Sequence, residues 1–290
     1  MDFNEIIQQL TQGFTAFTAG NALMIAVGLV LVTLAVVKEY EPVLLLPIGF
    51  GCIIANLGMS YEHGMMKVIY DAGISTELFP LLIFIGVGAM IDFRPLLAMP
   101  QMVILGAAGQ FGIYGTLLLA VLLGFNLPQA ASIGVIGAID GPTAIFVASK
   151  LAPEMLGPIA VAAYSYMSLI PIIQPPVMRL MTTRKERMVR MEYAARPVSK
   201  KLVVAFPIIV TLVVSLVAPS AAPLIATLML GNLLRESGVV DRLSKAAQNE
   251  IINIATLFLG LAIGSTMTAA NFLSWQTLAV LALGLLAFIL

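Results

Sequence analysis

Ile139-Asp140-Gly141-Pro142-Thr143 lies inside a long apolar segment, Ala130 to Ala152, and decides how that segment can fold. Asp140 is an acidic residue within a run long enough to enter a membrane, where a carboxylate is costly and by default marks a functional site. Pro142 has no N–H to donate and clashes with the preceding turn, so a regular helix breaks here. The stretch therefore predicts a broken helix at 130–152 with a carboxylate at the break.

The break offers the ligands that a hard cation prefers. It combines the Asp140 carboxylate, the Thr143 hydroxyl and the backbone carbonyls that are freed near Gly141. Broken helices at mid-membrane are also where transporters bind coupling ions. We therefore predict that Asp140, Gly141 and Thr143 form a site for a cation such as Na⁺. The alternative is a packing kink with a buried, protonated aspartate, although a kink alone needs no carboxylate.

The composition is that of a membrane protein. Of the 290 residues, 60% are hydrophobic and 10% are charged, and the mean hydropathy is +1.02, whereas soluble domains carry roughly a quarter charged residues. The net charge of zero gives no electrostatic support for binding nucleic acid. The single Cys52 and the single His63 exclude an intramolecular disulfide and metal sites built from several Cys or His residues. We predict an all-α polytopic fold.

The chain divides into four parts. Residues 1–20 place apolar residues at helical spacing, which predicts an N-terminal amphipathic segment at the membrane interface. Residues 21–178 hold a first transmembrane repeat, which includes the broken helix, and residues 202–290 hold a second repeat. Between them, residues 179–201 carry eight of the fifteen basic residues. By the positive-inside rule this basic loop is cytoplasmic. Topology alone accounts for most of these charges, and docking of a soluble partner is the alternative.

The two repeats resemble each other at an offset of 176 residues. Pro47 matches Pro223, Asn56 matches Asn232, and both pairs share the pattern P-x8-N-L. Gly88 of IGVGAM likewise matches Gly264 of LAIGST. Transporters are often built from such repeats, with the binding site at the repeat interface. If the 130–152 segment is re-entrant, the repeats are inverted, and we favour this arrangement.

The same offset makes a prediction about the second repeat. The counterpart of Asp140 falls near position 316, whereas the sequence ends at Leu290. We therefore expect the second repeat to lack its broken helix here, which leaves it incomplete.

Several long motifs resemble the β subunits of the Na⁺-translocating, biotin-dependent decarboxylases, a group that includes oxaloacetate, methylmalonyl-CoA and glutaconyl-CoA decarboxylases. The motifs are GAIDGPTAIFVASKLAP (137–153), AVAAYSYMSLIPIIQPPVMRLMTTRKERMVRM (160–191), EPVLLLPIGFG (41–51), FPLLIFIGVGAMIDF (79–93) and GNLLRESGVVDRLS (231–244). The similarity covers nearly the whole chain from residue 21 onward. A second site motif of the family, of the type N-P-L-I-G-x-A-G-V-S-A-V-P-M-A-A-R, would follow Leu290, and its absence puts a complete sodium site in doubt.

The resemblance implies a function. In this family a soluble α subunit transfers a carboxyl group to biotin, and the β subunit decarboxylates carboxybiotin at the membrane, consumes a proton and exports Na⁺. Asp140 matches the aspartate on the sodium and proton path, and Tyr164 and Tyr166 match tyrosines near it. The resemblance implies catalytic roles for these three residues, biotin on a partner subunit, partner subunits of α and γ type, and a bacterial or archaeal cytoplasmic membrane. The sequence also leaves open whether the chain forms a homo-oligomer.

Two other functions compete with this reading. A stand-alone secondary transporter for sodium and carboxylate, or for Na⁺ and H⁺, could use the same broken-helix site without biotin. A non-catalytic membrane anchor for a soluble enzyme would need no carboxylate at the break. Tyr164 and Tyr166 are two residues apart, so on one helix they face different directions. One of them is expected only to pack, and we favour Tyr166 as the functional one.

Overall fold

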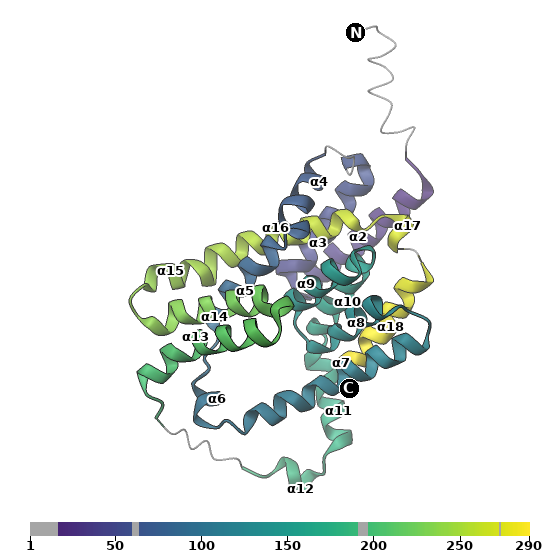
Figure 1. Cartoon of the computed structure of the whole chain (residues 1–290). Coiled ribbons are helices and arrows are strands. Elements are labelled where there is room, and N and C mark those ends of the chain that lie inside the picture. Colours follow the sequence, from purple (N-terminus) through teal and green to yellow (C-terminus); the bar gives the residue numbers. More distant parts are fainter. Residues whose placement is uncertain (1–16, 60–63, 191–196, 273) are drawn as a thin grey trace.

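The computed structural model describes residues 17–59, 64–190, 197–272 and 274–290, and the regular elements in this part of the chain are helices (Figure 1). Most of the predicted amphipathic segment at 1–20 lies outside the described residues. The first described helix begins where Thr18 and Asn21 form a capping box. In order, the α-helices are α2 (Ala19–Val37), α3 (Pro42–Ile54), α4 (Met65–Tyr70), α5 (Leu78–Met90), α6 (Arg94–Ala98), α7 (Met102–Leu122), α8 (Leu127–Gly134), α9 (Gly141–Leu151), α10 (Leu156–Ser168), α11 (Ile170–Met181), α12 (Arg184–Arg187), α13 (Lys200–Val217), α14 (Ala222–Ser237), α15 (Asp241–Ala246), α16 (Ile252–Thr266), α17 (Ala269–Phe272) and α18 (Trp275–Ile289).

Several of these helices can span a membrane, which confirms the all-α polytopic fold. Four are long and apolar enough by themselves: α2, α7, α13 and the continuous helix Asp241–Thr266, which includes α15 and α16. A further pair, α10 and α11, is bent by 68°. The bend lies at Ser168 to Ile170, and Pro171 begins the second arm, whereas Pro175 and Pro176 lie inside α11 without ending it.

The element bounds of the two halves agree at the predicted offset. Helix α4 and the π-helix at Asp71–Ser75 correspond, residue for residue, to α15 and the π-helix at Ala247–Ile251. Helices α5 and α16 end at Met90 and Thr266, which are also 176 residues apart. A π-helix is rare, so its occurrence at matching positions is consistent with the repeat, which stays a prediction.

The contacts between the halves are reciprocal. Asn56 donates from Nδ2 to the Met267 carbonyl at 2.8 Å, and Asn232 donates to the Ile91 carbonyl at 2.9 Å. Ile91 and Met267 are also 176 residues apart. The two hydrogen bonds therefore occupy equivalent positions in the two halves. Asn56 joins the π-helix Ala55–Met59, which follows α3, to the end of α16, and Asn232 joins α14 to the end of α5.

Helix directions follow from close contacts. Helix α16 runs antiparallel to α5, because Phe79 stacks on Phe258 while Gly86 lies against Ile252. It runs parallel to α3, because Gly260 lies against Pro47 and Gly264 against Cys52. Helices α3 and α5 are therefore antiparallel. Helix α14 runs in the same direction as α5, because Leu228 lies against Gly88 while Asn232, one turn later, donates to the Ile91 carbonyl. Helix α14 thus opposes α3, its counterpart in the first half, as an inverted repeat requires.

We expect Gly88→Ala to destabilise this interface. A Cβ at Gly88 would lie 1.8 Å from the Leu228 carbonyl oxygen, so the two backbones would have to separate. Overpacking of this kind typically costs about 1–3 kcal/mol. Gly106→Ala is the matched control, because a Cβ there meets nothing within 4 Å and alanine favours a helix over glycine. Thermal unfolding in detergent would test this, and an equal effect of the two substitutions would contradict it.

Candidate functional site

The predicted break lies between a 3-10 helix, Val135–Ala138, and α9. Ile139 adopts a left-handed conformation with φ 56°, which is unfavourable for a β-branched residue. Asp140 follows in an extended conformation as the N-cap of α9, and Gly141 begins the helix. Pro142 lies in the first turn, where its missing N–H has no intrahelical partner to lose. The chain therefore breaks two residues before Pro142, and proline starts the second arm.

The broken segment turns back on itself. Helices α8 and α9 pack together. Gln129, near the start of α8, donates from Nε2 to Glu154 Oε1 at 3.0 Å, and Glu154 lies just after the end of α9. The two ends of the segment are therefore adjacent, and Asp140 lies near the tip of the hairpin. A re-entrant segment would turn back in this way, and the inverted arrangement of the repeats stays a prediction.

Asp140 and Thr143 are in direct contact. The Thr143 hydroxyl donates to Asp140 Oδ2, and both residues are only partly exposed. The Asp140 carbonyl accepts from Ala144 N at 3.0 Å, so it serves as the first helical acceptor. The carboxylate and the hydroxyl thus converge as predicted. Gly141 is buried at the start of α9, and its part in cation binding stays a prediction.

Tyr164 and Tyr166 have different surroundings although both lie on α10. Tyr164 is fully buried, and its ring lies so close to Gly141 that a Cβ there would be 2.0 Å from Tyr164 Cε1. Its phenol is also within electrostatic range of Asp140 and Glu41. Tyr166 instead donates from its hydroxyl to the Leu281 carbonyl of α18 at 2.5 Å. The structure therefore brings Tyr164 to the break and directs Tyr166 to α18.

The structure contains an ion pair beside the hairpin that could not be predicted from the sequence. Lys150, in the last turn of α9, lies with its Nζ 3.1 Å from Glu77 Oε1, and the side chains are 35% and 24% exposed. Glu77 caps α5 in a left-handed conformation with φ 62°. The pair joins α9, the helix that Asp140 caps, to α5. Their separation of 73 positions leaves no local sequence signal that could have revealed the contact.

We expect Glu77 and Lys150 to stabilise each other. Glu77→Gln and Lys150→Met should each lower the melting temperature, and the double variant should be less destabilised than the sum of both. The coupling free energy should be about 0.5–1 kcal/mol, as for partly exposed pairs. A double-mutant cycle followed by thermal unfolding in detergent measures it. Additive effects would contradict the interaction.

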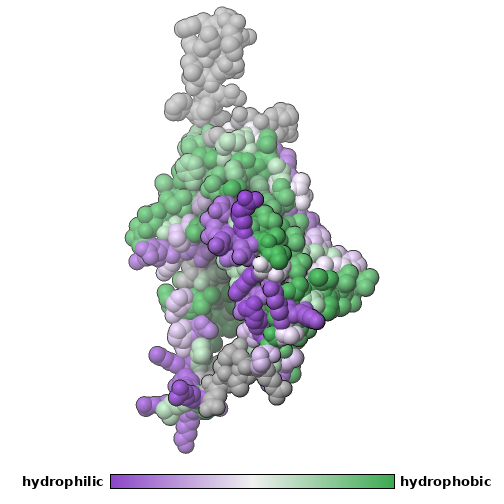
Figure 2. Space-filling model, turned by 90° about the vertical axis from the view of Figure 1, so that its left-hand side faces the viewer, coloured by the Kyte–Doolittle hydropathy of each residue, from purple (hydrophilic) through white to green (hydrophobic). Residues whose placement is uncertain are grey.

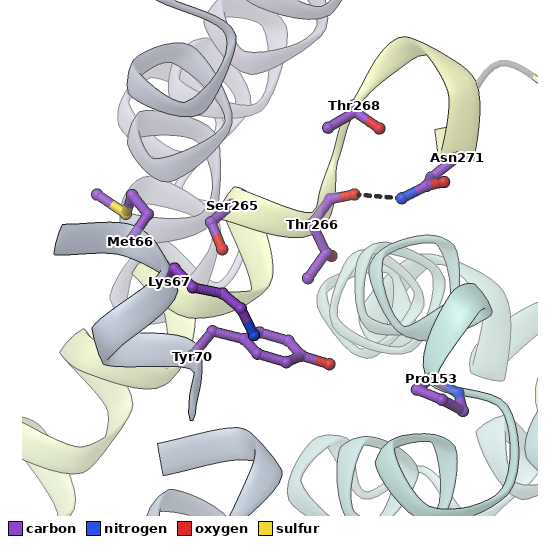
Figure 3. A pocket seen from close by; sticks show the side chains of 8 residues that line it. All are labelled: Met66, Lys67, Tyr70, Pro153, Ser265, Thr266, Thr268 and Asn271. Atoms are coloured by element: carbon purple, nitrogen blue, oxygen red, sulfur yellow. Dashed lines mark hydrogen bonds between the residues drawn. The ribbon is translucent and has the colours of Figure 1, made fainter. Parts of the chain in front are cut away.

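A polar pocket of about 290 Å³ lies near the other end of α9 (Figure 3). Figure 3 shows Lys67 and Tyr70 on one side, Pro153 on another, and Ser265, Thr266, Thr268 and Asn271 around the end of α16. The Ser265 and Thr266 hydroxyls donate to carbonyls of their own helix, at 2.7 and 2.8 Å. Lys67 pairs with Asp71 at 2.5 Å. These groups already have local partners, and Asp140 does not line this pocket.

The ligand set at the break differs from that of a multi-carboxylate metal centre. Within the described residues, no group of three or more His, Cys, Asp or Glu side chains could hold a metal ion. The break instead supplies one carboxylate and one hydroxyl beside irregular backbone. Such a set of oxygens suits a transported ion that must also leave.

The comparisons with known proteins agree with the motifs. The family model described as "Na⁺-transporting oxaloacetate decarboxylase beta subunit" matches residues 20–290. The chain is 56% identical over 278 residues to methylmalonyl-CoA decarboxylase subunit beta of Veillonella parvula, which covers 96% of this chain and 74% of the relative. It is 54% identical over 280 residues to glutaconyl-CoA decarboxylase subunit beta of Acidaminococcus fermentans, with the same coverage of 96% and 74%. It is 44% identical, over an alignment of 349 positions, to the oxaloacetate decarboxylase beta chain of Klebsiella pneumoniae. That alignment covers 98% of this chain and 80% of the relative.

Proposed function

We propose that this chain, which belongs to the family of β subunits of Na⁺-transporting decarboxylases, decarboxylates carboxybiotin and couples this reaction to Na⁺ export. The β-subunit assignment makes it a decarboxylase subunit with partner subunits and several membrane-spanning helices. Our proposal adds the partners: an α-type subunit that carries biotin, and a γ-type subunit. It also places the complex in a bacterial or archaeal cytoplasmic membrane, with the basic loop 179–201 inside.

The observation that carries the proposal is the contact between Asp140 and Thr143 at the tip of the hairpin. In the reaction the bond between the carboxyl carbon and the biotin nitrogen breaks, CO2 leaves, and the nitrogen takes up a proton. A carboxyl group that holds either Na⁺ or a proton can link the two events, because a nearby cation favours the ionised form. Arrival of Na⁺ at Asp140 would release the proton toward carboxybiotin.

The tyrosines take different parts in this proposal. Tyr164 lies against Gly141 and within electrostatic range of Asp140, so it can position the carboxylate or pass a proton to or from it. Tyr166 is held by the Leu281 carbonyl. It would reach the ion path only if α10 and α18 moved relative to each other. We therefore assign the direct role to Tyr164 and a conformational role to Tyr166.

The experiment that tests the function uses the complete complex in vesicles. Addition of the decarboxylase substrate should drive Na⁺ uptake and CO2 release together, and avidin should stop both because it sequesters biotin. Free carboxybiotin supplied to the purified β subunit should release CO2 faster with Na⁺ than without. If avidin leaves Na⁺ uptake unchanged, the result would favour the stand-alone transporter. If the rate of CO2 release does not depend on Na⁺, it would favour the non-catalytic membrane anchor.

A further inference from the structure

A second cavity, of about 390 Å³, lies far from the hairpin, where α6, α13 and α14 meet. Three basic residues, Arg94, Lys200 and Arg235, line it together with one acidic residue, Glu236. Lys200 is the first residue of α13 and belongs to the basic loop 179–201. The cavity therefore lies at the end of the molecule that carries the basic loop.

The charges in this cavity do not cancel. The Glu236 side chain is only 2% exposed and forms ion pairs with both arginines, directly with Arg94 Nη2 and at 3.5 Å with Arg235 Nε. Asp92, outside the lining, lies 3.4 Å from Arg94 Nη1. Two carboxylates thus face three cations, and an excess positive charge remains. Arg235 also donates from Nη1 to the Met90 carbonyl at 2.6 Å, which holds its guanidinium in place.

The start of α13 strengthens the positive potential. The N-terminus of this 18-residue helix borders the cavity at Val198 and Lys200. A helix N-terminus carries a partial positive charge and exposes N–H groups that suit an anion. Ser199 caps the helix by accepting from Leu202 N at 3.3 Å. The cavity thus combines side-chain cations with the positive end of α13, and the C-terminus of α14, at Glu236 and Gly238, brings a negative helix end to its lining.

Helix α13 also presents an apolar face outward. Its spanning segment is only 11% buried, and residues further along it, such as Leu212 and Leu216, are 60% and 83% exposed. The side of the molecule that carries α13, α14 and α15 shows broad hydrophobic areas beside hydrophilic patches (Figures 1 and 2). An anion bound in the cavity would therefore lie at the polar end of a surface suited to acyl chains.

We propose that this cavity binds the phosphate group of an anionic phospholipid, with the acyl chains along α13. Basic pockets between transmembrane helices bind lipid headgroups by this chemistry. Free phosphate shares the charge and the donors that it needs, but it gains nothing from the apolar face of α13. In a phospholipid the phosphate is attached to acyl chains that can pack on this face, and this contact favours the lipid over free phosphate.

The test uses the purified complete complex after delipidation, with phosphatidylglycerol, the matching neutral diacylglycerol, and inorganic phosphate as separate probes. Phosphatidylglycerol should raise the melting temperature and form adducts in native mass spectrometry, and the other two probes should do neither. Lys200→Gln should weaken the binding about fivefold, the effect of one basic residue near a lipid surface. Lys201→Gln removes the neighbouring charge, which does not line the cavity, and should leave the affinity unchanged.

Three outcomes would overturn the assignment. Equal losses in the Lys200 and Lys201 variants would mean that lipid binds only through diffuse charge. Protection by inorganic phosphate equal to that by phosphatidylglycerol would mean that the cavity takes the free anion. Lys200→Glu reverses the charge. If it leaves the affinity for phosphatidylglycerol unchanged, the cavity does not bind the lipid. Lys200 is exposed, so circular dichroism should show that these variants keep their helical content.

Discussion

Asp140→Asn should abolish Na⁺-coupled decarboxylation, with a loss of at least about 100-fold in turnover. General acid–base contributions of this size are typical, and the substitution also removes the charge that would hold Na⁺. Asparagine keeps the size of the side chain and can still accept from the Thr143 hydroxyl, the bond that Asp140 makes in the structure. The fold at the break should therefore survive. CO2 release from carboxybiotin and ²²Na⁺ uptake would be measured on the same vesicles.

Two controls sharpen this result. Thr143→Ser keeps the hydroxyl and should retain most of the activity, whereas Thr143→Ala removes it and should weaken the apparent affinity for Na⁺ more than the maximal rate. Asp71→Asn changes an exposed carboxylate that pairs with Lys67 and should leave the coupling intact. Full sodium-coupled turnover in Asp140→Asn would refute the role that we propose for this carboxylate.

The residues around the break illustrate what the sequence could predict. Asp140, Pro142 and Thr143 made the break and its polar groups predictable, because each is chemically out of place in an apolar segment. The left-handed backbone was not predictable at Ile139, since a β-branched residue disfavours that conformation. The packing of the hairpin imposes it. Local chemistry thus located the break and its polar groups, and tertiary contacts set its backbone.

The partners of the site illustrate what the sequence could not predict. The spacing of Tyr164 and Tyr166 predicted that they face different directions, but the rotation of α10 decides which one meets the break. Sequence reasoning favoured Tyr166 as the functional residue, whereas the structure puts Tyr164 against Gly141. The pairing of Glu77 with Lys150 likewise depends on how α5 and α9 pack. By contrast, the offset of 176 that the sequence suggested agrees with the bounds of α4 and α15 and of the π-helices that follow them, although no π-helix was predicted.

Gly141→Ala should inactivate the protein and lower its stability. The added Cβ would lie 2.0 Å from Tyr164 Cε1 and 2.3 Å from Cζ, and Tyr164 is too deeply buried to move aside easily. We expect a loss of about 1–3 kcal/mol in stability from overpacking, together with a displaced Asp140. Gly109→Ala is the matched control, because a Cβ there would meet nothing within 4 Å. Melting temperature and CO2 release would be measured for both variants.

The double variant Gly141→Ala/Tyr164→Leu separates packing from chemistry. Leucine lacks the outer ring atoms that the new Cβ would meet, so the double variant should regain most of the lost melting temperature. If the Tyr164 phenol acts on Asp140, turnover should stay low although the fold is restored, and Tyr164→Phe alone should be slow yet well folded. If turnover returns together with stability, Tyr164 serves only to pack α10 against α9. The proton path would then have to run through other groups near Asp140, of which the Thr143 hydroxyl is the first to test, because it is bonded to the carboxylate.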